Sequence, residues 1–380
     1  MNPSPRLRRN RRIAAAAAVV VVIVGVGVTV GFALMHGSGA DLPNASASRS
    51  PAPDPVDTPT PTPTALTAAE ALLAGSADPA ACAVSFEGDG IDLAPQLQVQ
   101  GAMYAALPIP DREGEVFAGW YGSPADAAAH AIAGRVNGSR EVACADRQIT
   151  LYGAWMSPDD NAAENAQIPI MMYHQFTTNP DGESGWLRGN YAYIGDFDAH
   201  MAYIAESGFY LPTWDELAAF IDGRLFLPDH SVIITDDDAD HTWLELAVPV
   251  VDKYRLLTTS FVITVWRSEP TPSKYVLQRS HTHEMHESGA NGQGLMVNWS
   301  AEQIAADLET SASILGAKEV VAYPFGHYNE TTKEGMRMAG FELGRTIEGG
   351  YVHIGTDKLA LPVVRINYGM GVGLLPELIG

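Results

Sequence analysis

The stretch Val232-Ile-Ile-Thr-Asp-Asp-Asp238 joins three apolar residues directly to three carboxylates. A short β-branched run is typical of a strand buried in a parallel sheet, so the carboxylates are predicted to stand where that strand ends. Two further segments have the same form, an apolar run that leads into polar or turn-forming residues: Ile168-Pro-Ile-Met-Met-Tyr-His174 and Val320-Val-Ala-Tyr-Pro-Phe-Gly326. Because strand ends of a parallel α/β barrel converge on one face, we expect these polar side chains to lie together.

Strand-like and helix-like segments alternate through residues 165–380, which is the pattern of βα units. Residues 197–204 place apolar side chains at helical spacing. Thr213-Trp-Asp-Glu216 and Ser300-Ala-Glu-Gln303 have the form of capping boxes, which begin helices. About six such units fit a barrel somewhat smaller than the eight-unit one.

The three aspartates at 236–238 cannot all point to one side, because side chains alternate along a strand. One carboxylate can bind a cation while its neighbour faces the substrate as a base. The alternative is an ordinary solvated acidic loop. The apolar run that leads into the aspartates favours a position at the inner edge of the domain.

Three histidines fall within six residues, at His281, His283 and His286. His281 and His286 are separated by about 140° on a regular helix, so they can share a cation only from a bent loop. His283 and His286 can instead share a helix face, and surface histidines without a ligand are a third possibility. An HExxH zinc site is excluded by the residues that follow His286. Imidazoles with one carboxylate give a three-ligand centre that leaves positions for water.

At this point a family resemblance can be stated. Thr235-x-Asp237-Asp238, Ser280-His281 with His286, and Tyr323-Pro-Phe-Gly326 resemble, in this order, the successive motifs of polysaccharide deacetylases. These are the NodB-homology domains of carbohydrate esterase family 4. The early His174 and the five-residue histidine spacing are most similar to the circularly permuted subgroup that includes poly-β-1,6-N-acetylglucosamine deacetylases. The resemblance implies a distorted (β/α)7-type barrel.

The resemblance also implies a ligand set and a base. Asp238, His281 and His286 would bind a divalent metal, most plausibly Zn²⁺. Asp237 would be the general base that takes a proton from the attacking water. The implied reaction is metal-dependent removal of N-acetyl groups from a GlcNAc-containing polysaccharide or peptidoglycan at the cell surface.

The remaining implied roles concern the oxyanion and the leaving group. The backbone N–H of Phe325 would complete an oxyanion site, and His174 would protonate the departing amine. The arginine often found before the Pro-Tyr motif is absent, so Arg365 is expected to orient Asp237.

Two positions depart from the family pattern. Asp236 replaces an aromatic or aliphatic residue, and Ala239 replaces glycine. A third carboxylate would raise the pKa of the base by repulsion or would offer a rival ligand. These departures motivate one alternative, a glycan-binding surface protein that has lost turnover. A further alternative is an O-deacetylase or amidase on the same scaffold.

Residues 80–157 are predicted to form a separate, small α+β domain of short strands with one helix. The runs Phe117-Ala-Gly-Trp-Tyr121 and Leu151-Tyr-Gly-Ala-Trp155 resemble the internalin-type B repeat, a small β-grasp module of surface proteins. That resemblance implies a wall- or glycan-facing module without catalysis, and a plain spacer is the alternative. The expected strands are 82–86, 96–100, 115–121 and 148–155, with a helix at 123–133.

The two cysteines, Cys82 and Cys144, fall in or beside this predicted domain. An exported pair more often forms a disulfide than not, and free buried thiols are the alternative. No Cys/His cluster exists, which argues against a thiolate zinc site.

The N-terminal segments predict export. Residues 1–12 are basic and residues 13–35 are uncharged. At about 1.5 Å per residue that run reaches about 34 Å, enough to cross a hydrocarbon core of about 30 Å. We expect a single-pass membrane anchor with the folded domains outside the cytoplasm, followed by a Pro/Ser/Thr-rich linker at 36–79. A signal peptide cleaved near Ser38-Gly39-Ala40 is the alternative.

The net charge of the chain limits the classes of binding partner that we expect. The chain has 23 Lys+Arg and 45 Asp+Glu, a formal charge of -22. Nucleic-acid partners require a basic surface and are therefore excluded. The expected partners are an acetylated glycan and, through the N-terminal helix, the cell membrane.

Overall fold

The fold is described from a computed structural model, which defines residues 65–380 of the chain. The predicted basic segment at 1–12, the anchor at 13–35 and the first part of the linker lie outside the described residues. Within residues 65–380 no helix has the length and apolar character needed to cross a membrane.

Seven parallel strands close into a barrel. Their order around it is β10-β11-β12-β13-β14-β6-β9, and every neighbouring pair is parallel. The α/β barrel expected from the alternating pattern is confirmed. The strands are β6 (Ile170–Tyr173), β9 (Ile233–Asp238), β10 (Thr258–Val262), β11 (Val276–Ser280), β12 (Val320–Ala322), β13 (Leu343–Gly349) and β14 (Leu361–Arg365). A short pair, β7 (Gln175–Thr177) and β8 (Tyr191–Tyr193), follows β6.

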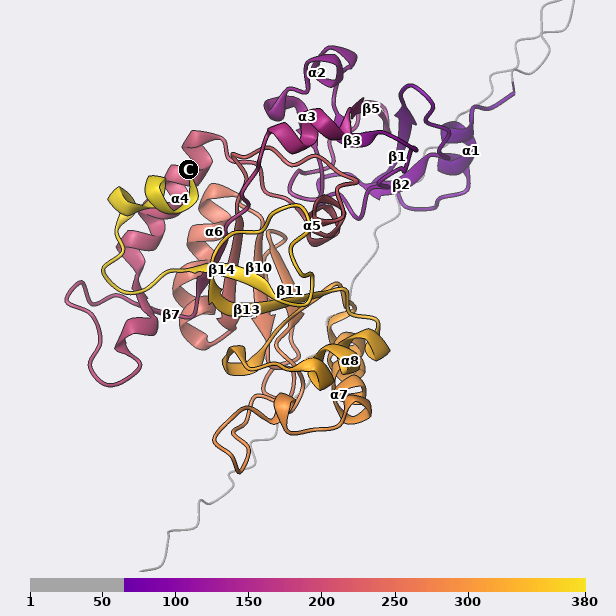
Figure 1. The fold of residues 1–380 in the computed structure, drawn as a ribbon. Coiled ribbons are helices and arrows are strands. Elements are labelled where there is room, and N and C mark those ends of the chain that lie inside the picture. The colour runs from indigo at the N-terminus through magenta and orange to yellow at the C-terminus, as the bar shows by residue number, and fades with distance from the viewer. Residues whose placement is uncertain (1–64) are drawn as a thin grey trace, which may run out of the picture. The chain divides into compact units, whose positions relative to one another are not determined.

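Helices cover the outside of the barrel (Figure 1). The predicted capping boxes at Thr213 and Ser300 are both present and begin α5 and α7. Helix α4 ends at Gly208 in the left-handed conformation that glycine adopts readily. The helices of this part of the chain are α4 (Ile194–Ser207), α5 (Trp214–Ile221), α6 (Val248–Tyr254), α7 (Ala301–Leu315), α8 (Glu330–Ala339) and α9 (Leu375–Ile379). A π-helical turn at Trp243–Ala247 leads into α6.

Residues before the barrel form a mixed five-stranded sheet of order β2-β1-β5-β3-β4, in which β1 and β5 are the parallel pair. The four predicted strands and the predicted helix of this region are confirmed. The elements are β1 (Ala81–Glu87), β2 (Gln96–Val99), β3 (Val116–Tyr121), α2 (Pro124–Ala129), β4 (Arg135–Val136), β5 (Gln148–Met156) and α3 (Pro158–Ala163). We call residues 80–157 the N-terminal module.

The last part of the predicted linker is folded. Helix α1 (Ala68–Ala74) lies inside the range 36–79, begins with a capping box at Thr67 and contacts β1. A disulfide joins Cys82 on β1 to Cys144, with their Cα atoms 6.3 Å apart, within the usual range for a disulfide. The pair is therefore bridged, and the free-thiol alternative is wrong.

The N-terminal module packs against the barrel as part of one compact unit that runs from Pro63 to Gly380. The backbone N–H of Phe117 on β3 donates to Arg224 O, and the N–H of Phe226 donates to Phe117 O, both at 2.9 Å. One hydrophobic cluster joins Phe117 and Trp120 of the module to Trp214 and to side chains of the barrel strands. The module and the barrel thus share a core.

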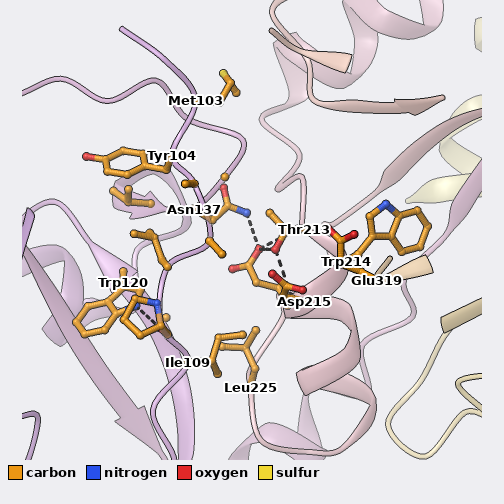
Figure 2. A pocket seen from close by; sticks show the side chains of 18 of the residues that line it. Met103, Tyr104, Ile109, Trp120, Asn137, Thr213, Trp214, Asp215, Leu225 and Glu319 are labelled. Carbon is orange, nitrogen blue, oxygen red and sulfur yellow. Dashed lines mark hydrogen bonds between the residues drawn. The ribbon is translucent and has the colours of Figure 1, made fainter. Parts of the chain in front are cut away.

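A small cavity remains at this junction (Figure 2). Its volume is about 180 Å³, with Tyr104, Trp120 and Asn137 on the module side and Trp214 and Glu319 on the barrel side. Glu319 directly precedes β12, so the module meets the barrel where strands begin. The candidate catalytic residues stand where strands end, at the opposite face of the barrel.

Candidate metal centre and active site

One carboxylate and two imidazoles come together at the carboxyl ends of the barrel strands. A ligand atom from each of Asp238, His281 and His286 lies within 4.8 Å of the others. Asp238 Oδ1 is 3.5 Å from Nε2 of His281 and 3.4 Å from Nε2 of His286. The structure therefore brings together the three residues predicted as metal ligands.

Strand geometry places these ligands. Asp238 is the last residue of β9, and the backbone there turns through positive φ at Asp238 (74°) and Ala239 (51°). This is the left-handed region, which explains why the family pattern has glycine after the second aspartate. His281 directly follows β11. Positive φ values also occur at Thr282 and Phe325, so backbone strain gathers at this site.

The segment 281–286 is a bent loop, not a helix. Asp307 on α7 holds it, because the carboxylate accepts the backbone N–H groups of His283 and Glu284, both at 2.7 Å. Because of this bend, the His283 side chain points away from Asp238 and His286. Nδ1 of His283 lies 3.0 Å from Thr264 Oγ1 instead. The candidate ligand pair is consequently His281 with His286, and the alternative pair of His283 with His286 is wrong.

The donor set fits a divalent cation. Asp238 Oδ1 is buried and makes no hydrogen bond within the described residues, although it lies between two imidazole nitrogens. The other oxygen of Asp238 accepts from Gln175 Nε2 at 3.3 Å. His281 Nδ1 lies 2.9 Å from Ala322 O, which leaves Nε2 directed at the site. Two imidazoles and one carboxylate form the three-ligand pattern of catalytic zinc sites.

Electrostatics favour binding at two of the three candidate ligands, His286 and Asp238, whereas Asp238 raises the pKa of His281 despite its burial. Burial, and then the neighbouring His281, lowers the pKa of His286 to about 4, so this imidazole is neutral at pH 7. Burial would raise the pKa of Asp238, but the two histidines outweigh it and lower the pKa well below its usual range. A neutral imidazole and an ionised carboxylate are the forms that bind metal.

Asp237 lies beside this centre and is 2% exposed. Its Oδ2 is 3.6 Å from Nε2 of His174, which follows β6. Its Oδ1 is paired with the guanidinium of Arg345 on β13. Burial would raise the pKa of Asp237, but Arg345, followed by His174, outweighs burial and lowers it. The carboxylate is therefore ionised and lies in contact with a histidine.

The guanidinium that holds Asp237 is not the one expected. Arg365, at the end of β14, donates to Asn367 Oδ1 at 3.1 Å and to Asn190 Oδ1 at 2.7 Å. The prediction that Arg365 orients Asp237 is wrong. Arg345 is fully buried inside the barrel, where β13 faces β9 across the interior. The sequence around Arg345 predicts a strand. No local signal in it indicates that the Arg345 side chain reaches Asp237.

Asp236 neither joins the ligand set nor contacts Asp237. It is fully buried, and its Oδ2 accepts from Ser260 Oγ at 3.3 Å. Burial first, and then the charge of Asp237, raises its pKa well above the ordinary value. Because side chains alternate along β9, Asp236 points away from Asp237. The expectation of a rival ligand is wrong.

Phe325 stands at a tight turn after β12, with φ 59° and ψ 9°. Gly326 N–H donates to Tyr323 O at 2.8 Å and His327 N–H donates to Pro324 O at 3.0 Å. The Phe325 N–H takes part in neither bond. Its ring lies 4.5 Å from the ring of His286, between centroids. The turn therefore brings the Phe325 ring against one of the candidate metal ligands.

Residues 227–344 match the family model described as "Polysaccharide deacetylase". Over 230 residues the chain is 24% identical to YxkH of Bacillus subtilis (strain 168), whose name assigns it provisionally to the polysaccharide deacetylases. That match covers 57% of this chain and 76% of YxkH.

Two further similarities were found, one in sequence and one in structure. A poly-beta-1,6-N-acetyl-D-glucosamine N-deacetylase of Staphylococcus aureus (strain MRSA252) is 28% identical over 161 residues. This match covers 37% of the chain and spans about half, 56%, of that relative. The solved Streptococcus pyogenes deacetylase PplD in complex with acetate has a TM-score of 0.48 at 21% identity, with 57% of this chain and 99% of that chain covered. Residues 227–344, which match this family model, include Asp237 and the three candidate metal ligands.

Proposed function

We propose that this chain is a metal-dependent hydrolase that removes N-acetyl groups from a GlcNAc-containing polysaccharide. The observation that carries the proposal is the cluster of Asp238, His281 and His286 beside the buried Asp237. The family match and the names of the staphylococcal relatives support an acetylated amino-sugar polymer as the substrate.

The cation is proposed to be Zn²⁺, held by Asp238, His281 and His286. Imidazole and carboxylate ligands suit zinc, and three protein ligands leave a position for water or substrate. A bound cation would supply Lewis acidity to an amide carbonyl, which is a poor electrophile without it.

Asp237 and His174, which lie in contact beside the candidate ligands, are proposed to carry out the proton transfers. Asp237, kept ionised by Arg345, is placed to accept a proton from the attacking water. Burial lowers the pKa of His174, so its resting imidazole is neutral; it is proposed to take the proton from Asp237, 3.6 Å away, and to give it to the departing amine. The backbone N–H of Phe325 is proposed to donate to the carbonyl oxygen as negative charge develops on it.

The test is acetate release by the full chain from N-acetylglucosamine oligomers and peptidoglycan, with and without a chelator. We expect activity that a chelator abolishes and that added zinc restores. Asp237→Asn should lower kcat by roughly 100-fold or more while zinc still binds, because the base is removed and the ligands remain. Release that is indifferent to the chelator, or absent on every acetylated glycan, would contradict the proposal.

A glycan-binding protein without turnover is the second candidate, motivated by Ala239. Its φ of 51° is a conformation that costs an alanine about 1–2 kcal/mol relative to glycine, so the end of β9 is held under strain. Binding of zinc and glycan without acetate release, and without any effect of Asp237→Asn, would favour this candidate. Release from O-acetylated but not N-acetylated glycans would favour an O-deacetylase.

The proposed location is the outer face of the cell membrane. The basic residues 1–12, the uncharged run at 13–35 and the disulfide Cys82–Cys144 support an exported, anchored protein. The B-repeat-like sequence of residues 80–157 supports a surface protein as well. Fractionation should find the full chain with the membrane and a chain that begins at residue 65 in the soluble fraction.

A further inference from the structure

A hollow with an aromatic wall adjoins the candidate metal centre. Its volume is about 290 Å³, and it is lined by Ile263, Val265, Trp266, His283, Glu284, His286 and Glu287. His286 is also one of the three candidate metal ligands. The hollow therefore begins at the reaction centre and extends away from it between the loops that follow β10 and β11.

Trp266 forms the aromatic wall of the hollow, and its side chain is largely exposed to solvent. It is 62% exposed, and its ring lies 5.7 Å from the ring of His286, between centroids. A large exposed indole costs stability in solvent unless it serves binding, and aromatic side chains are typical of ligand pockets. Its flat face suits the apolar face of a sugar ring.

The loop that bears Trp266 is fixed to the loop that bears the ligands. Thr264 N–H donates to Thr282 O at 3.1 Å, and Val265 N–H donates to His283 O at 3.4 Å. The turn closes with Trp266 N–H donating to Ile263 O at 3.0 Å. The indole is consequently held in place relative to His286, as a binding surface requires.

Two acidic residues also line the hollow. Glu284 and Glu287 both line it and both are exposed. The nearest cation in sequence, Arg267, is directed elsewhere, since its guanidinium donates to Thr271 Oγ1 at 3.2 Å. Exposed carboxylates beside an indole favour a cationic group over a neutral one of similar shape.

We propose that this hollow is a subsite for a neighbouring sugar that already carries a free amine, a glucosamine unit. Trp266 stacks on its ring, and Glu284 and Glu287 attract its ammonium group. An N-acetylglucosamine unit has no charge there and gains only the stacking. The enzyme thus prefers a chain that is already partly deacetylated, and it acts next to earlier products. This inference rests on the proposed deacetylase activity of the same centre.

The experiment compares two tetramers of β-1,6-linked sugar with the zinc-loaded full chain. One is fully N-acetylated, and the other carries one internal glucosamine. We expect kcat/KM per acetyl group to be about fivefold higher for the second, and this preference should shrink at high salt because exposed charges are screened. Glu284→Gln with Glu287→Gln should abolish the preference, so that kcat/KM per acetyl group becomes equal for the two tetramers. Equal kcat/KM for both tetramers in the wild type would overturn the proposal.

Matched variants separate stacking from charge. Trp266→Ala should lower kcat/KM about tenfold on both tetramers, whereas Trp266→Phe should keep most of it, because the aromatic face remains. Glu302→Gln with Glu309→Gln, on the exposed side of α7, removes the same charge elsewhere and should keep the preference. Loss of the preference in this control pair would assign it to overall charge and overturn the subsite.

A binding measurement distinguishes failure of the subsite from failure of the proposed function. A tetramer of glucosamine has no acetyl group to lose, so its affinity is measured by calorimetry without turnover. Binding that Trp266→Ala weakens by about tenfold, with no acetate release on any substrate, would support the subsite and reject the deacetylase. Acetate release with no binding of this tetramer would reject the subsite alone.

Discussion

Arg345 and Asp237 form an ion pair inside the barrel, from β13 to β9, and neither side chain is more than 3% exposed. A buried pair of this kind is costly to break, because one charge is left without its partner. The same pair keeps the pKa of Asp237 low despite burial. The barrel thus uses a core position to keep the carboxylate of Asp237 ionised.

Arg345→Met is expected to lower the free energy of unfolding by about 3–5 kcal/mol and to raise the pKa of Asp237. Because the base acts only when ionised, the acidic limb of the profile of kcat/KM against pH should move to higher pH. Activity at alkaline pH should survive in part. Arg365→Met, whose guanidinium contacts Asn190 and Asn367, should leave that limb in place. An equal shift in both variants would contradict the assignment.

The affinity for zinc should depend on pH. Between pH 7 and 5, the slope of its logarithm against pH should be set by one histidine, His281. Burial opposes protonation of His281, but Asp238 outweighs it and raises its pKa, whereas the pKa of His286 falls to about 4. As pH falls from 7 to 5, zinc must displace one proton, from His281. The logarithm of the affinity should therefore fall by about one per pH unit, and by about two below pH 4.

Competition with a zinc-binding dye measures this slope. His281→Ala should flatten the dependence between pH 7 and 5, and His286→Ala should keep a slope of one at a lower affinity. A slope of two in the wild type over that range would show that both imidazoles are protonated in the free protein, contrary to the predicted order.

Asp307 is expected to control zinc affinity without touching the site. Its carboxylate accepts two N–H groups of the loop 281–286, and an amide oxygen and nitrogen cannot replace both acceptors. Asp307→Asn should weaken zinc binding by about 10-fold or more. Glu309→Gln, exposed on the same helix, is the matched control. Unchanged zinc affinity in Asp307→Asn, with a lower melting temperature only, would make Asp307 purely structural.

The N-terminal module is expected to be required for a stable barrel. Asn137 donates to Leu211 O at 2.9 Å and to Glu216 Oε2 at 2.5 Å, and Arg135 lies 3.6 Å from Glu216 Oε1. All of these groups are buried or nearly so. Asn137→Ala should cost about 2 kcal/mol, because it leaves buried acceptors without a donor.

Truncation tests the same interface more severely. Residues 165–380 alone would expose Trp214 and Leu225 and should be insoluble or unfold at low denaturant, whereas residues 65–380 should unfold in one transition. A soluble, zinc-binding fragment of residues 165–380 would show that the module is an independent domain, as the sequence predicts.

Local patterns in the sequence were sufficient for the elements, whereas the set of candidate ligands came from the family resemblance. Alternation and β-branched runs identify the strands, and the capping boxes at Thr213 and Ser300 identify the starts of α5 and α7. Asp238 and His281 stand at strand ends, and parallel strands bring their ends to one face whatever the details of packing. The strands and helix starts depend on neighbours in the chain, so the sequence determines them by itself, whereas His286 reaches the same place through a loop that Asp307 holds.

Contacts across the barrel were decided only by the tertiary structure. Whether Arg345 or Arg365 reaches Asp237 depends on the register of β13 and β14 relative to β9, and sequence spacing does not encode that register. Asp236 becomes a buried partner of Ser260 because β10 lies beside β9. The junction of the module with the barrel likewise joins residues 107 positions apart, such as Phe117 and Arg224. Such pairings follow from how whole elements pack together, and no single stretch of sequence specifies them.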